Sequence, residues 1–149
     1  MKNDISPKKT KIVFGNDSIV IRKYFSGIAG GRTLDCSDFP NDDIYAGHVI
    51  IKKANGNYAP MPIVAAVPAK PAQGDSPAVP AQPEKYGILP TGASYVGVLY
   101  RSISKDKPGA SIMNHGIVNP AVTPYPMDSI MAAFKAAVPN ISFEQDEEA

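Results

Sequence analysis

Short apolar runs separated by turn residues make up most of this chain. Four of these runs are rich in β-branched and aromatic residues, which favour β-strands, and they span residues 18–25, 46–53, 95–102 and 110–119. Glycine, proline or asparagine lies close to the ends of these runs, as is usual where strands end in turns. The pattern therefore predicts a mainly β fold, a small β-barrel or sandwich-like domain built from short strands.

A tight turn is predicted at Asn55-Gly56, directly after the second of these runs. An Asn-Gly pair accepts positive φ at both central positions of a type I′ turn, so residues 58–64 should return beside the preceding strand. Pro60 and Pro62 have no backbone N–H to donate to a neighbouring strand. The returning strand is therefore expected at an edge of the sheet.

One segment has the spacing of an amphipathic helix. Ile130, Phe134 and Val138 recur every four residues, which predicts a C-terminal α-helix over residues 127–138 with one apolar face. Proline at position 139 marks its end.

A proline- and alanine-rich segment interrupts the strand pattern at residues 65–84. Five of its twenty residues are proline and six are alanine, so it cannot build a core, and we expect a disordered insertion. Recognition by a proline-binding groove is the alternative for this segment. Residues 1–11 are predicted to form a flexible basic arm and residues 144–149 an acidic tail, which leaves a single β-rich domain over residues 12–143.

The composition limits the classes of partner. The net charge is +1, with 15 basic and 14 acidic residues, whereas a nucleic-acid-binding protein normally carries a basic excess. No apolar run reaches the ~20 residues needed to cross a bilayer, and the N-terminus lacks the apolar region of a signal peptide. We therefore expect no nucleic acid, no membrane and synthesis in the cytoplasm.

No motif in the sequence assembles an active site. Cys36 is the only cysteine, which excludes an internal disulfide, and no motif supports a nucleophilic triad of Cys36, His115 and an aspartate. His48 lies in an apolar strand pattern, where a structural role is expected. The four loop carboxylates lack the alternating spacing of a calcium-binding loop; they are Asp35, Asp38, Asp42 and Asp43. We predict a non-enzymatic protein with no catalytic residue, cofactor, metal or small-molecule substrate.

The order of glycine-anchored elements resembles that of the lambda-type head decoration proteins of tailed phages. The pieces that carry the resemblance precede a short helix and are Gly47–Lys52, Asn55-Gly56 with Pro60, Tyr86–Leu89, Val96–Leu99 and His115–Asn119. The long N-terminal segment and the proline-rich insertion depart from that family and leave the base domain of a head-fibre protein as a related interpretation.

The resemblance implies a homotrimer that binds the major capsid protein on the outside of a phage head and decorates or stabilises it. The N-terminal segment would then contact the capsid by adding a strand to it, through Lys8, Lys9, Lys11, Ile12, Val13 and Phe14. Tyr95 and Tyr100 are an odd number of residues apart, so we expect them on opposite faces of one strand. The expected oligomer interface contains Tyr95, Tyr100 and His115. The alternative function is a carbohydrate-binding or adhesin-like β module, which the absence of tryptophan disfavours.

Overall fold

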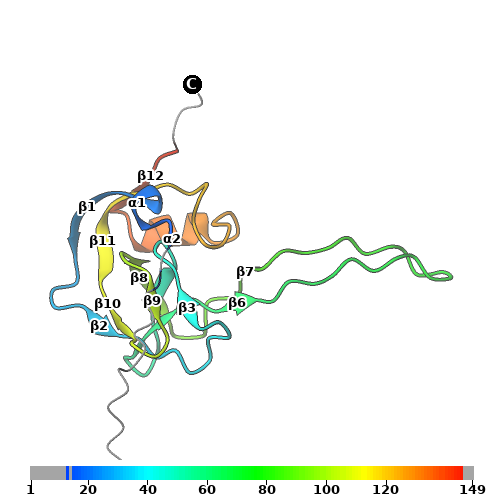
Figure 1. The fold of residues 1–149 in the computed structure, drawn as a ribbon, viewed down its shortest axis with the longest axis horizontal. Helices are drawn as coiled ribbons and strands as arrows, with labels where there is room; N and C mark the ends of the chain where they lie inside the picture. The colour runs from blue at the N-terminus through cyan, green and yellow to red at the C-terminus, as the bar shows by residue number, and fades with distance from the viewer. Residues whose placement is uncertain (1–12, 14, 146–149) are drawn as a thin grey trace, which may run out of the picture.

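The computed structural model describes residue 13 and residues 15–145, and it confirms the mainly β fold class. The largest sheet is open and contains six strands (Figure 1); they are β1 (Ile21–Gly27), β4 (Val49–Lys52), β5 (Tyr58–Pro60), β8 (Ser94–Leu99), β11 (Ile112–Val118) and β12 (Ile141–Phe143). Five of them follow the order β1-β11-β8-β4-β5, and β12 pairs in parallel with β11.

Three two-stranded sheets surround the main sheet. They pair β2 (Arg32–Thr33) with β10 (Gly109–Ala110), β3 (Asp43–Ile44) with β9 (Ile103–Ser104), and β6 (Ile63–Val64) with β7 (Lys85–Tyr86). The two helices are α1 (Asp17–Val20), a single turn, and α2 (Met131–Ala137). Within the part of the chain that the structure describes, neither helix has the length or the apolar character to cross a membrane.

The hairpin predicted at Asn55-Gly56 joins β4 to β5, but its turn is not the predicted type I′, because Gly56 has a positive φ and Asn55 does not. Gly56 has a φ of +89°, and the Asn55 side-chain oxygen accepts a hydrogen bond of 3.0 Å from the backbone N–H of Asn57. β5 ends at Pro60 and forms one edge of the main sheet, as the missing proline donors predicted.

The main sheet separates two apolar clusters, because alternate side chains of a strand point to opposite faces. In β4, Val49 and Ile51 enter the cluster beneath α2, whereas Ile50 enters the cluster on the other face with Leu34. α2 is shorter than the helix predicted over residues 127–138, because Ile130 and Val138 are its caps. Its predicted apolar face is confirmed: Phe134 is fully buried and Ile130 and Val138 are nearly so. Burial of a side chain of this size contributes about 1.5–3 kcal/mol.

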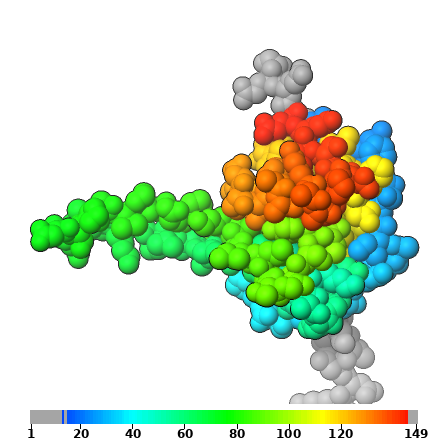
Figure 2. Space-filling view, turned by 180° about the vertical axis from the view of Figure 1, so that it is seen from behind, coloured from blue at the N-terminus to red at the C-terminus, as the bar shows by residue number. Residues whose placement is uncertain are grey.

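The proline- and alanine-rich segment projects from the body as a long double-stranded ribbon (Figures 1 and 2). Residues 64–85 are all exposed. The sequence predicts a disordered insertion here, but in the structure backbone hydrogen bonds join the two halves at three positions, the first between Val67 and Gln82. The predicted arm, residues 1–11, and the last four residues of the acidic tail lie outside the described residues.

Candidate interaction surface

Strand β1 forms an open edge of the main sheet and presents aromatic residues to solvent. Among the described residues, β1 pairs only with β11 and ends the strand order on that side (Figure 1). Five consecutive residues of β1 are exposed, from Arg22 to Ser26. Tyr24 is 44% exposed and Phe25 is 50% exposed. A strand that is exposed on both faces and along one edge can pair with another polypeptide.

The aromatic side chains of β1 lie beside one residue just after β8 and one residue of β11. The ring of Tyr24 is 4.5 Å from that of Tyr100, and the ring of Phe25 is 4.9 Å from the imidazole of His115. Cations flank both pairs: Lys23 Nζ lies 5.1 Å from the centre of the Phe25 ring, and Arg101 Cζ lies 5.3 Å from that of Tyr100. We call Tyr24, Phe25, Tyr100 and His115 the aromatic edge.

Two of the three residues predicted for an oligomer interface lie in this aromatic edge. Tyr100 is half-buried and His115 is exposed. Tyr95 is different, because it is buried and packs against Phe134 with 5.7 Å between ring centres. The prediction of an interface role for Tyr95 is therefore corrected: its side chain belongs to the core.

A bulge in β8 explains why Tyr95 and Tyr100 do not lie on opposite faces. Ile50 pairs with Gly97 and Ile51 pairs with Tyr95, which leaves Val96 as an extra residue. One extra residue reverses the alternation of side chains beyond it. Both tyrosines therefore pack against the same apolar cluster.

The sequence indicated a strand at β1 but not its surface role. The sequence did contain a signal for this role, because apolar and polar residues do not alternate along Arg22-Lys23-Tyr24-Phe25. A strand with this sequence carries a cation and an aromatic ring on each of its two faces. Of the residues predicted to contact a capsid, Val13 is described and half-buried. The others, Lys8, Lys9, Lys11, Ile12 and Phe14, lie outside the described residues.

Asp17, the first residue of α1, anchors this helical turn to the rest of the fold. The carboxylate of Asp17 accepts hydrogen bonds from the backbone N–H and the hydroxyl of Ser102, at 2.9 and 2.5 Å. The Ser102 hydroxyl in turn accepts a hydrogen bond of 3.0 Å from the backbone N–H of Ala46. These contacts hold the start of α1 against the β8–β9 connection.

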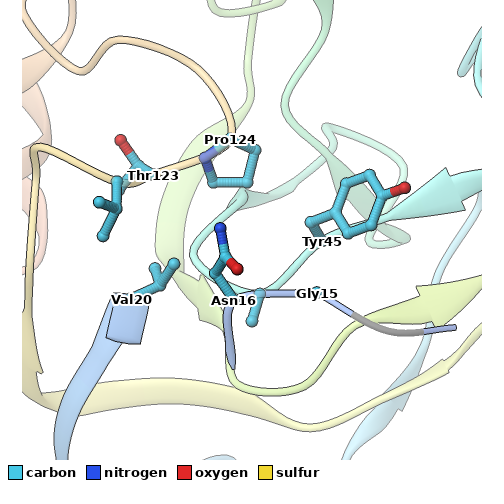
Figure 3. Close-up of a pocket in the computed structure, with 8 residues that line it drawn as sticks. Gly15, Asn16, Val20, Tyr45, Thr123 and Pro124 are labelled. Atoms are coloured by element: carbon cyan, nitrogen blue, oxygen red, sulfur yellow. The ribbon is translucent and has the colours of Figure 1, made fainter. Parts of the chain in front are cut away.

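A hollow of about 370 Å³ lies beside this junction. Figure 3 shows Asn16 near its centre, with its amide directed towards Pro124 and with Val20, Tyr45 and Thr123 around it. Tyr45 supplies the only ionisable side chain of the lining. The hollow therefore offers apolar surface and neutral hydrogen-bonding groups, which suit contact with a peptide better than acid–base chemistry.

The candidate catalytic residues do not come together in the described part of the chain. Cys36 is buried, with its sulfur 3.8 Å from the Leu34 carbonyl oxygen, and burial raises the pKa of its thiol. His115 lies instead beside Phe25 in the aromatic edge. His48 is fully buried, as expected of a structural histidine.

Two of the four loop carboxylates form an ion-pair site with a lysine. Lys53 Nζ lies 3.0 Å from a carboxylate oxygen of Asp35 and 3.6 Å from one of Asp38. Hydrogen bonds from Ser37 and then from Lys53 lower the pKa of Asp35 to about 2. Among the described residues, no group of three or more histidine, cysteine or acidic residues is arranged to hold a metal ion.

Comparison with known proteins gave no match: no family model, curated protein or solved structure is significantly similar to this chain.

Proposed function

We propose that this chain is a non-enzymatic structural protein of a phage virion, which binds the outside of the capsid as a homotrimer and decorates or stabilises the head. The observation that carries the proposal is the aromatic edge, which is centred on the exposed strand β1; only the single turn α1 separates this strand from the N-terminal segment. The sequence resemblance to head decoration proteins supplies the kind of partner, the major capsid protein.

The exposed edge supports binding to a protein surface. The outer N–H and C=O groups of β1 can extend a sheet into a partner, and tyrosine and arginine are enriched among the residues that dominate protein interfaces. Weak contacts that repeat over a symmetric shell add up through avidity. A small contact surface can therefore suffice for a protein that binds in many copies.

The chemistry of the buried groups supports a structural role. The Cys36 thiol is shielded and its pKa is raised, so little reactive thiolate forms near neutral pH. The His48 imidazole packs edge-on against Phe39 and Tyr86, with 5.2 Å between ring centres in each pair. In these environments both side chains act as packing groups.

Co-sedimentation with expanded empty heads, assembled from the major capsid protein of the phage that encodes the chain, tests the proposal. We expect the natural protein to sediment with the heads and the Tyr24→Ser/Phe25→Ser variant to bind at least about tenfold more weakly. Replacing Lys8, Lys9 and Lys11 with glutamine should also weaken binding, most clearly at low salt.

The matched control is Ile88→Ser, which removes an apolar side chain that is 92% exposed and lies outside the aromatic edge. This variant should bind the heads like the natural protein. A natural protein that stays in the supernatant at low salt would contradict the proposal. Binding to a glycan array without binding to heads would favour the carbohydrate-binding alternative.

A further inference from the structure

The ribbon that projects from the body is held together at every third residue. Val67 pairs with Gln82, Lys70 with Val79, and Gln73 with Ser76. In each pair both backbone N–H groups donate to the opposite carbonyl oxygen, over 2.8 to 3.2 Å. The turn between the halves consists of Gly74 and Asp75, and Gly74 has a φ of +57°, as the first central position of a type II′ turn requires.

The sequence explains this spacing of three. In an ordinary antiparallel ladder, the pair after Val67 and Gln82 would join Ala69 to Pro80, and proline has no N–H to donate. The ribbon contains four three-residue repeats, in each of which a paired residue is followed by proline and alanine. They are Val67-Pro68-Ala69, Lys70-Pro71-Ala72, Ser76-Pro77-Ala78 and Val79-Pro80-Ala81. The polyproline II helix has three residues per turn. Once in every turn, each half therefore places a residue that has an N–H group opposite the other half.

This arrangement leaves one backbone donor unused in each three-residue repeat. The N–H groups of Ala69, Ala72, Ala78 and Ala81 take part in none of the ribbon's hydrogen bonds, and all four residues are exposed. Figure 2 shows the ribbon extending beyond the body with no other described segment along it. The carbonyl group of each of these alanines belongs to the same trans peptide unit as the paired N–H of the next residue, and the two groups of such a unit point in opposite directions. The alanine carbonyl groups therefore face away from the opposite half.

These unused groups select a particular kind of partner. Donors and acceptors alternate along the ribbon with a repeat of three residues, roughly 9 Å in polyproline II geometry. An ordinary β-strand has a two-residue repeat and falls out of step with them. A second ribbon has the same repeat, and its alanine side chains are small enough for the backbones to approach. Lys70 and Asp75 are the only charged residues between Val67 and Gln82 and have opposite signs, so two ribbons do not repel each other strongly.

We infer that the ribbon is a self-association surface, in which the alanine N–H groups of one copy of this chain donate to the carbonyl groups of the ribbon of a second copy. The inference rests on the proposed function only for the homotrimer, to which it adds a specific contact. It assigns the proline- and alanine-rich segment a role in holding copies together away from the surface that binds the capsid.

The test removes the four donors and leaves the rest of the ribbon in place. In the quadruple variant Ala69→Pro, Ala72→Pro, Ala78→Pro and Ala81→Pro, the new prolines fit polyproline II geometry. The matched control replaces the same four alanines with serine, which keeps every N–H. Sedimentation velocity with light scattering should show self-association of the natural protein and the serine variant. The proline variant should have a dissociation constant at least about tenfold higher.

Amide hydrogen exchange supplies a second readout on the natural protein. Protection of the four alanine amides should rise with protein concentration, whereas protection of the Val67, Lys70, Val79 and Gln82 amides should stay constant. A natural protein that remains monomeric at every concentration would overturn the inference, and so would a proline variant that associates as tightly as the serine control. If self-association is confirmed but the heads are not bound, the ribbon contact stands and the capsid role fails.

Discussion

At the scale of single residues, the fold decides the protonation state of His48. The imidazole Nε2 donates a hydrogen bond of 2.9 Å to the Met61 carbonyl oxygen, and Nδ1 has no partner among the described residues. Burial lowers the pKa of His48 to about 4, although the bond to Met61 opposes this shift. Protonation would place a charge and an unpaired N–H inside an aromatic cluster.

His48 should therefore make the stability of the protein depend on pH. The folded state holds His48 neutral, and the unfolded state protonates it near pH 6.5. Its contribution is complete above that pH and is lost as the pH falls towards 4. The free energy of unfolding should decrease by about 3 kcal/mol over this interval. Urea unfolding at a series of pH values measures the decrease.

The control for this prediction removes the titrating group itself. His48→Leu should flatten the pH dependence between pH 6.5 and 4. Asp35 acts mainly at lower pH, because its pKa is 3.8 in the unfolded chain and about 2 in the folded protein, so its contribution is lost as the pH falls from about 4 towards 2. An unchanged slope in His48→Leu would show that another group is responsible.

At the scale of elements, the contact between β8 and β11 depends on a glycine. A Cβ atom placed on Gly97 would collide with the carbonyl oxygen of Met113 and would lie 3.1 Å from a methyl carbon of Ile112. Gly97 is also the residue beside the bulge in β8. The absence of a side chain thus allows the two central strands to approach at the point where the register shifts.

Gly97→Ala should push β11 away from β8 and lower the free energy of unfolding by about 1–3 kcal/mol, the usual cost of overpacking. The matched control is Gly109→Ala, because a Cβ at that position meets no atom within 4 Å. This control should change stability by less than ~0.5 kcal/mol. Equal stability of the two variants in urea would mean that the strands can separate without cost.

At the scale of the whole molecule, the body and the ribbon depend on each other very little. Both apolar clusters are built from residues of the body, and no residue between 65 and 84 is among their buried members. The ribbon is exposed over its full length and is attached through β6 and β7. Its role must therefore lie outside the stability of the single chain.

Replacing residues 68–81 with Asn-Gly tests this independence. Val67 and Gln82 already form a doubly hydrogen-bonded pair, and a two-residue turn fits between such partners. The free energy of unfolding should change by less than ~0.5 kcal/mol. Phe134→Ala, in the core, should lower it by about 3–5 kcal/mol. A large loss of stability in the shortened chain would show that the ribbon supports the body.

The sequence by itself determined the features that depend on local geometry. The prolines excluded a regular ladder in the ribbon and placed β5 at an edge, and the four-residue spacing of Ile130, Phe134 and Val138 located α2. Asn55-Gly56 fixed the β4–β5 turn. Each of these follows from the steric limits and hydrogen-bonding groups of a few neighbouring residues.

The tertiary structure alone decided the features that depend on distant contacts. Residues 18–25 have the pattern of one strand, but β1 begins only at Ile21, because Asn16 accepts hydrogen bonds from the N–H groups of Ile19 and Val20 to form a helical turn. The bulge at Val96 moved Tyr95 into the core. The aromatic edge exists because β1 pairs with β11, about ninety residues away in sequence, and such pairing depends on the packing of the whole sheet.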